Sequence, residues 1–136
     1  MAVELLHNKY LKEIKAYADT FSVSLIHDDS IEYIKNFIKE NNIKSILEIG
    51  TTTGYTSICI ALIDEKIKVI SIEKDGARYL QAVKNIKKFF LENRIALIYN
   101  DALAVTLNQK FDLILIDASM GRYITMFNYF TEYLNE

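Results

Sequence analysis

Two kinds of apolar pattern alternate along this chain, and their alternation limits the folds that it can adopt. Four short runs are almost continuously apolar, which is typical of strands buried on both faces. The strands predicted from these runs are residues 45–50, 67–73, 95–101 and 111–117. Longer segments with apolar residues at helical spacing separate them, so the pattern predicts an α/β fold with a parallel sheet covered on both faces.

The helical pattern also precedes the first predicted strand. The chain therefore divides into a helical part and a part in which strands and helices alternate. Apolar stripes include Ile14, Ala18 and Phe21 in the first segment, and Ile34 and Phe37 in the second. We expect one domain over residues 1–136, with N-terminal helices in 1–42 and a β/α core in 43–136. The predicted helices are residues 10–21, 28–42, 55–65, 76–93, 102–109 and 122–136.

Composition excludes several classes of function. The net charge of −2 predicts no strong general attraction to nucleic acid or to an anionic membrane. No apolar run approaches the ~20 residues of a membrane span, and charges interrupt the first apolar residues, so we expect no signal peptide. A single cysteine, Cys59, excludes an internal disulfide and fits a reducing cytoplasm.

The segment SILEIGTTTGYTS, residues 45–57, contains two of the four glycines in the chain. It joins the first predicted strand to the following helix, and ligands of open α/β sheets bind beyond the carboxyl ends of the strands. Gly50 permits a sharp turn out of the strand. Gly54 opens the helix and lets the backbone approach a ligand. The segment therefore predicts a ligand site.

An acidic residue, Glu73, ends the second predicted strand 23 residues after Gly50. A carboxylate there can accept hydrogen bonds from both hydroxyls of a ribose, as in dinucleotide-binding folds. The glycine spacing is G-x-x-x-G, however, and a pyrophosphate needs bare backbone at a helix N-terminus. A nucleoside with an amino-acid tail is therefore favoured, and an NAD-dependent dehydrogenase is the disfavoured alternative.

Four motifs together resemble a class I S-adenosylmethionine-dependent methyltransferase. They are E-x-G-x-x-x-G in 48–54, the acid at Glu73, NDA in 100–102 and DASMGRY in 117–123. More narrowly, the chain resembles the cation-dependent O-methyltransferases of the catechol and caffeoyl-CoA type, including a bacterial branch that methylates 5-hydroxyuridine in tRNA. The resemblance covers the chain from about Tyr10 onward and implies a Rossmann-like sheet with strand order 3-2-1-4.

The resemblance also implies a role for each matching residue. Glu73 would bind the ribose, and Asp101 and Ala102 would border the adenine. Asp117 would lie near the methionine part and, in the family, also ligates a divalent cation. The residues that would hold the methionine part are Glu48, Gly50, Thr52, Tyr55 and Thr56.

The chemistry implied is methyl transfer to a hydroxyl acceptor, which is either a small aromatic compound or a tRNA hydroxyuridine. The acceptor oxygen must lose its proton, and a Mg²⁺ ion can lower its pKa and orient it. Mg²⁺ needs one or two carboxylates besides substrate and water. Asp117 would supply one, and it is the residue expected to take part in catalysis.

Two departures from the family pattern bear on activity. Met120 stands where the family commonly has a lysine that is a candidate general base. The strand that would complete the metal site with an Asp-Asn pair has no counterpart, so the chain is expected to lack the last strands of the sheet. The apolar strand 111–117 would then be an open edge, which predicts a homodimer through that edge. A cofactor-binding or assembly module without turnover is the alternative.

Overall fold

The computed structural model describes residues 2–117, 127 and 129–135. Two helices come first, α1 (Ala2–Thr20) and α2 (Asp28–Glu40). The β/α part then begins with β1 (Ser45–Ile49) and α3 (Tyr55–Ala61). Its remaining elements are β2 (Lys68–Glu73), α4 (Gly76–Lys88), β3 (Ile95–Tyr99), the 3₁₀ turn η1 (Ala102–Ala104), β4 (Leu113–Ile116) and the 3₁₀ turn η2 (Thr131–Tyr133).

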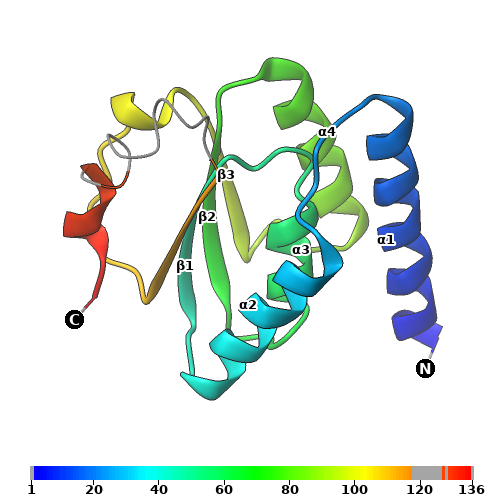
Figure 1. Cartoon of the computed structure of the whole chain (residues 1–136), viewed down its shortest axis with the longest axis horizontal. Coiled ribbons are helices and arrows are strands. Elements are labelled where there is room, and N and C mark those ends of the chain that lie inside the picture. The colour runs from blue at the N-terminus through cyan, green and yellow to red at the C-terminus, as the bar shows by residue number, and fades with distance from the viewer. Residues whose placement is uncertain (1, 118–126, 128, 136) are drawn as a thin grey trace.

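The four strands form one parallel sheet in the order β3-β2-β1-β4, which confirms the predicted topology. Leu47, near the centre of β1, pairs with Ile70 of β2 and with Ile114 of β4. Because all strands run the same way, their carboxyl ends meet at one edge of the sheet, which is the upper edge in Figure 1. Loops that leave this edge can therefore share one ligand.

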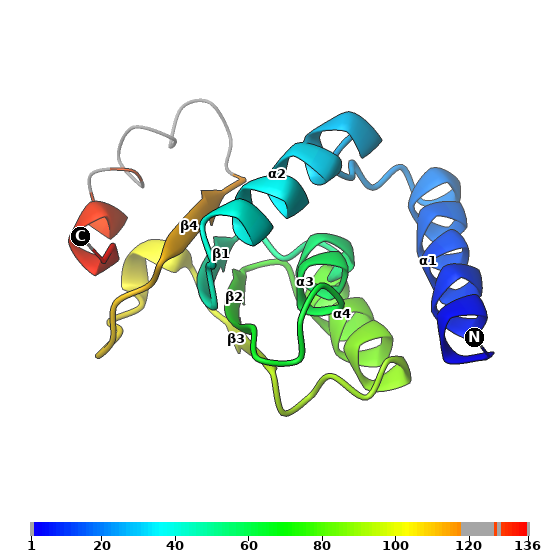
Figure 2. The same cartoon turned by 90° about the horizontal axis from the view of Figure 1, so that it is seen from below.

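Two apolar cores cover the two faces of the sheet. The larger core joins Ile46 and Val69 to α3, α4 and the N-terminal helices. The smaller core joins Leu47 and Ile72 to η1 and to Phe130 of the C-terminal segment. Figure 2 shows these layers edge-on, with α3 and α4 on one side and the C-terminal segment on the other. Alternate residues of one strand thus fill opposite cores, as expected for a sheet buried on both faces.

The first helix packs on the outside of α4. The ring of Tyr10 meets Phe89 edge-on at 5.6 Å between ring centroids, and Lys88 pairs with Glu13 at 2.7 Å. Ile14 and Ala18, from the predicted stripe, are buried. None of the helices in the described part of the chain has the length and apolarity needed to cross a membrane.

The structure corrects several predicted helix bounds. Residues 102–109 form only the single turn η1. Asp101 caps the start of this turn, and the turn ends early because Val105 returns to an extended conformation. The chain leaves α4 at Phe90, whose φ of 57° is left-handed, so this helix ends before residue 93. The predicted apolar stripe includes Phe21, but α1 ends at Thr20 and Phe21 is 63% exposed.

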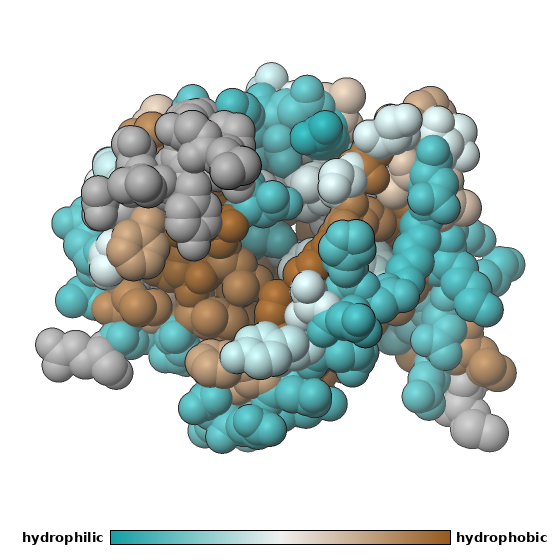
Figure 3. Space-filling model, viewed as in Figure 1, coloured by the Kyte–Doolittle hydropathy of each residue, from teal (hydrophilic) through white to brown (hydrophobic). Residues whose placement is uncertain are grey.

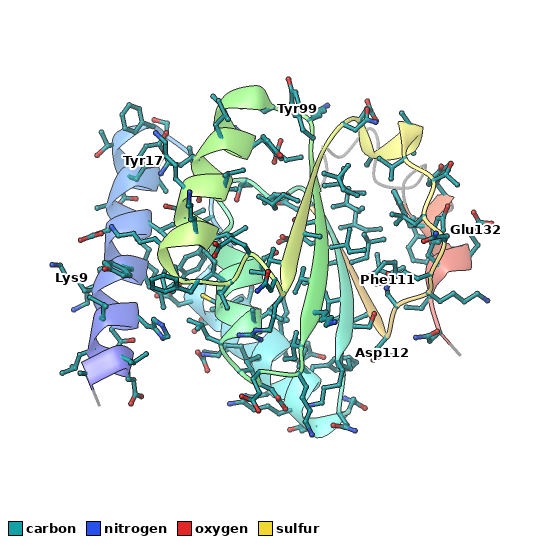
Figure 4. All side chains as sticks on the ribbon, turned by 180° about the vertical axis from the view of Figure 1, so that it is seen from behind. Lys9, Tyr17, Tyr99, Phe111, Asp112 and Glu132 are labelled. Carbon is teal, nitrogen blue, oxygen red and sulfur yellow. The ribbon has the colours of Figure 1, made fainter. Side chains whose placement is uncertain are left out.

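The predicted helix 122–136 falls partly outside the described residues. In the part described, a helical segment ending at Phe130 leads into η2, and Leu134 then forms a parallel β-bridge with Phe111. The N–H of Phe111 donates to the Tyr133 carbonyl at 2.7 Å. Figure 4 shows Phe111 and Asp112 at the start of β4, on the side of this segment. Leu134 is therefore extended rather than helical.

The strand at the edge of the sheet, β4, carries apolar side chains on both faces. All four of its residues are half-buried. Figure 3 shows apolar surface in front of β4, between the C-terminal segment and α2. The C-terminal segment contacts the amino end of the strand through the bridge at Phe111.

Candidate ligand site at the carboxyl ends of the strands

The loop that follows β1 has an uncommon backbone conformation. Gly50, Thr52 and Gly54 have φ values of 94°, 51° and 86°, all in the left-handed region. A side chain at Gly50 would collide with the backbone oxygen of Asp117, which follows β4. Gly50 therefore serves both a turn and a close approach of two strand ends, whereas Thr52 adopts its conformation at an energetic cost.

Hydrogen bonds from β2 hold this loop. The N–H of Gly50 donates to the Ile72 carbonyl at 2.8 Å. The N–H of Thr52 donates to Oε1 of Glu73 at 2.8 Å, and the N–H of Asp75 donates to Oε2 of the same carboxylate at 2.9 Å. Glu73 is therefore fixed by backbone on both sides, with its carboxylate between the glycine loop and the start of α4.

A buried polar network lies beneath the loop. Both Ser57 of α3 and Ser71 of β2 donate to Oε1 of Glu48, at 2.5 and 2.7 Å. The Ser71 hydroxyl also lies 2.6 Å from that of Thr51. Burial raises the pKa of Glu48 to about 7, and the two serine hydrogen bonds oppose this shift. Glu48 is therefore a buried carboxyl that titrates near neutral pH.

Three carboxylates meet at this edge of the sheet. The negative charges of Asp117 and Glu73 add to the rise in the pKa of Glu48. Partial burial raises the pKa of Asp117, and the positive charge of Arg78 opposes that shift. Asp117 is still partly open to solvent, while Glu48 and Glu73 are buried. A cluster of carboxyl groups of this kind favours a cationic ligand and disfavours an anionic one.

The first residues of α3 lie beside the loop. Tyr55 is 5% exposed, and the Lys15 ammonium of α1 lies 5.7 Å from its ring centroid. Burial is the main cause that raises the pKa of Tyr55 to about 12. Its side chain thus faces the N-terminal helices, and what it can offer a ligand at the loop is its backbone. Thr56, the next residue, is half-buried.

Asp101 and Ala102 follow β3 at the same edge of the sheet. Oδ1 of Asp101 accepts the N–H of Leu103 at 2.9 Å, so this acid caps η1. Ala102 is buried in the smaller core. Tyr99, the last residue of β3, points out from this edge (Figure 4) and stacks on Tyr79 at 5.2 Å between ring centroids. The two predicted adenine neighbours therefore begin a structured turn.

Within residues 2–117, 127 and 129–135, no cluster of three or more His, Cys, Asp or Glu side chains could hold a metal ion. Asp117 brings one carboxylate to the edge of the sheet. Met120 and the rest of DASMGRY after Asp117 lie outside the described residues. These residues do not make a divalent-cation site by themselves.

Sequence reasoning missed the polar side chains that support the loop. Ser71 and Asn85 are buried, and Asn85 donates from Nδ2 to the Thr53 carbonyl at 2.8 Å. A signal was present for both residues. Ser71 is a lone polar residue inside an apolar strand, and Asn85 occupies a position on the apolar stripe of α4 between Ala82 and Ile86.

Comparison with protein-family models matches residues 2–136 to the O-methyltransferase family. A tapetum-specific methyltransferase of Arabidopsis thaliana is 30% identical over 96% of this chain and 57% of its own length. A flavonoid 3',5'-methyltransferase of Vitis vinifera is 30% identical over 68% of the chain and 43% of its own length. The chain therefore spans about half the length of these relatives.

Solved structures agree with this assignment. A Staphylococcus aureus protein described as a candidate caffeoyl-CoA O-methyltransferase superimposes with a TM-score of 0.87 and 27% identity, over 98% of this chain and 68% of its own. An O-methyltransferase of Bacillus cereus in complex with SAH gives a TM-score of 0.84 at 20% identity, over 93% of this chain and 62% of its own. The second match shows the fold alone. The family model, which extends over nearly the whole chain, shows that the protein belongs to the O-methyltransferase family.

Proposed function

We propose that the chain binds S-adenosylmethionine and is the cofactor-binding part of an O-methyltransferase. The observation that carries this proposal is the meeting of Glu48, Glu73 and Asp117 at the carboxyl ends of β1, β2 and β4. S-adenosylmethionine carries a sulfonium and an ammonium group, so it brings positive charge to this acidic edge. NAD would bring a pyrophosphate, which needs bare backbone at a helix N-terminus, whereas this loop carries three threonines between its glycines.

The glycine loop supports the same ligand. Its left-handed residues leave backbone N–H groups at the start of α3. The carboxylate of an amino-acid tail can accept hydrogen bonds from these groups. Glu73 is already held by Thr52 and Asp75, so its carboxylate is preorganised for the ribose hydroxyls. Residues Gly50, Gly54, Tyr55 and Thr56 would contribute mainly backbone, and Asp101 and Ala102 would border the adenine.

The chain's own contribution to catalysis is alignment. When bound, S-adenosylmethionine supplies an electrophilic methyl group, whose bond to sulfur breaks as a bond to the acceptor oxygen forms. The loop and Glu73 would hold the nucleoside at the carboxyl ends of the strands, where Asp117 is the exposed acid of the site. Holding two reactants in line can contribute on the order of 7–11 kcal/mol. Asp117 would stabilise positive charge before transfer, accept a hydrogen bond from the acceptor hydroxyl and take up its proton as the oxygen is methylated.

A hydroxyl group on a small aromatic molecule is the acceptor class we favour. The Vitis vinifera relative acts on flavonoids according to its name, and other relatives are named for caffeoyl-CoA. A hydroxyuridine of tRNA is the second acceptor class. The two can be separated by offering the protein a catechol probe and a hydroxyuridine-containing tRNA stem-loop with the same cofactor.

A Mg²⁺ ion does not enter the mechanism proposed here. The family resemblance gives Asp117 the role of a metal ligand, and Asp117 could supply one oxygen. The residues described around it do not provide the further ligands. The metal role of Asp117 stays a prediction, which Mg²⁺ titration in the presence of an acceptor can test.

A binding or assembly module without turnover is the second function, and a specific observation favours it. The residue that the family uses as a candidate base is Met120 here, and a thioether cannot accept a proton at neutral pH. Such a module would bind S-adenosylmethionine and transfer no methyl group. Product analysis with a labelled methyl group, with and without Mg²⁺, separates the two functions.

The half-buried apolar strand β4 supports a homodimer in which two copies cover this edge. Sedimentation equilibrium should then give twice the chain mass, and a stable monomer would contradict the dimer.

Cysteine usage supports a cytoplasmic location, which fractionation of expressing cells can test.

Calorimetric titration tests the proposed cofactor. S-adenosylhomocysteine should bind with 1:1 stoichiometry, and NAD at the same concentrations should give no heat of binding. The reverse order of affinities would favour a dehydrogenase. Binding of neither compound would contradict the proposal as a whole.

A further inference from the structure

The glycine loop cannot keep its conformation without help from its surroundings. Three of its five residues are left-handed, and one of them is Thr52, for which that conformation is strained. Its internal hydrogen bond, from the N–H of Gly54 to the Thr51 carbonyl at 3.0 Å, closes only one turn. The position of the loop therefore depends on neighbouring elements.

One of these elements is β2, which holds the first half of the loop. The N–H groups of Gly50 and Thr51 both approach the Ile72 carbonyl, at 2.8 and 3.3 Å. The N–H of Thr52 donates to Glu73 at 2.8 Å. These contacts all lie on one side of the loop. The peptide after Thr53 is held within the loop through the N–H of Gly54 alone, which leaves its carbonyl oxygen to a partner outside the loop.

The other element is α4, which holds the second half through Asn85. Its Nδ2 donates to the Thr53 carbonyl at 2.8 Å, and its side chain is buried. Nε2 of Gln81, one turn earlier, donates to Oδ1 of Asn85 at 3.3 Å and orients the amide. Ala82, fully buried on the same helix face, packs under Gly54.

We propose that Asn85 is a positioning residue for cofactor binding, acting through the Thr53 carbonyl on the glycine loop. This inference rests on the proposed function, because it concerns the loop that would hold the methionine part. The N–H of the peptide between Thr53 and Gly54 is bound to Thr51 and its carbonyl to Asn85, so this peptide is held at both ends and the N–H groups at the start of α3 keep their orientation. Without the bond from Asn85 this peptide keeps only its bond to Thr51 and is less well ordered, so part of the binding energy is spent on reordering it.

A purely structural role makes a different prediction, because it would lower stability without changing affinity. Arg94 provides a matched control for this role. Its guanidinium donates to the carbonyls of Ala61 and Asp64, each at 2.8 Å, and to that of Ile67 at 3.3 Å. It therefore also ties backbone oxygens of neighbouring segments together, but it lies next to the amino end of β3, at the opposite edge of the sheet.

The first test compares Asn85→Leu with Arg94→Met in the full chain. Both variants should have lower melting temperatures than wild type. Asn85→Leu should bind S-adenosylhomocysteine about tenfold more weakly, the factor that corresponds to ~1.4 kcal/mol for one buried hydrogen bond. Arg94→Met should bind within twofold of wild type.

The second test uses Asn85→Asp and a pH series. A protonated carboxyl group can still donate to the Thr53 carbonyl, whereas an ionised one cannot donate and repels that oxygen. We therefore compare the dissociation constants of this variant and of wild type for S-adenosylhomocysteine at each pH. The ratio of variant to wild type should rise with pH. This variant keeps the shape of the side chain, so it remains informative if Asn85→Leu does not fold.

The outcomes separate the inference from the function on which it rests. If wild type does not bind S-adenosylhomocysteine, the proposed function fails and the inference fails with it. If wild type binds, then equal affinities of Asn85→Leu and Arg94→Met, or a pH-independent ratio for Asn85→Asp, overturn the inference alone. A selective loss for Asn85→Leu with a rising ratio for Asn85→Asp supports it.

Discussion

The carboxylate of Glu73 accepts the backbone N–H of Thr52 at 2.8 Å, which ties the end of β2 to the glycine loop that follows β1. Its second oxygen accepts the N–H of Asp75 at 2.9 Å, just before α4. The residue expected to bind a ribose therefore also shapes the loop expected to bind the amino-acid tail. Changes at Glu73 should affect both parts of the ligand.

Replacing Glu73 by alanine should weaken cofactor binding by ~1–3 kcal/mol, because hydrogen bonds to a charged group are lost. Titration calorimetry with S-adenosylhomocysteine measures this loss. Asp112→Ala is the control: Oδ2 of Asp112 accepts the N–H groups of Lys44 and Ser45, at the amino end of the sheet. The control should keep wild-type affinity. Equal affinities of Glu73→Ala and wild type would show that the ribose lies elsewhere.

Replacing Glu48 by glutamine should change how stability depends on pH. The folded-state pKa of Glu48 is raised from 4.5 to about 7, so the folded protein binds more protons than the unfolded chain between these values. Its stability should therefore fall as pH rises through that window, by on the order of 3 kcal/mol. Glutamine does not titrate and keeps an oxygen for Ser57 and Ser71.

Urea unfolding at pH 5 and pH 8 measures this effect. The unfolding free energy of Glu48→Gln relative to wild type should increase between the two pH values. A difference that stays constant from pH 5 to pH 8 would show that Glu48 titrates as an ordinary exposed acid.

Two neighbouring threonines should respond in opposite ways to valine. Both are buried, but Thr51 Oγ1 lies 2.6 Å from the Ser71 hydroxyl, whereas Thr53 Oγ1 has no hydrogen-bond partner among the described residues. Thr51→Val should cost about 1 kcal/mol of unfolding free energy, and Thr53→Val should be neutral or stabilising. Denaturant unfolding of the pair gives the answer. A larger loss for Thr53→Val would mean that its hydroxyl is hydrogen-bonded.

Gly50 and Gly76 form a second matched pair. Gly50→Ala combines a left-handed φ of 94° with a collision against the backbone of Asp117, and should cost on the order of 2–4 kcal/mol. Gly76 begins α4, and an added methyl group would meet only the side chain of Tyr99, whose hydroxyl would lie 3.2 Å away. Gly76→Ala should stay within about 0.5 kcal/mol of wild type. Similar melting temperatures for the two variants would contradict the tight turn.

The fold could be predicted from the sequence where the apolar pattern is strong. The runs around Leu47, Ile70 and Ile114 are apolar on both faces, which predicts buried strands. The three strands are neighbours in the sheet. Ends of elements were predicted less well, since they depend on local backbone choices. Phe90 ends α4 in a left-handed conformation that glycine or asparagine usually adopts. The pairing of Leu134 with Phe111 depends on a contact between distant residues, which no local pattern signals.

The site was predictable in its outline and less so in its supports. Gly50 and Gly54 are left-handed, as a tight strand-to-helix turn requires, and Glu73 lies beside their loop. The buried contacts of Ser57, Ser71 and Asn85 were not predicted, because each joins elements far apart in the sequence. The binding roles of Gly50, Gly54 and Glu73, like those of Asp101 and Asp117, remain predictions.

A titration of the ¹⁵N-labelled protein with S-adenosylmethionine, followed by amide chemical shifts, tests the central claim most directly. The account predicts that the largest changes fall on the amides of Gly50 to Thr56 and on Lys74 and Asp75, which flank the three carboxylates. Amides at the amino ends of the strands, such as Lys44 and Asp112, should move little. Changes centred on those amino ends or on α1, or no changes at saturating cofactor, would contradict it.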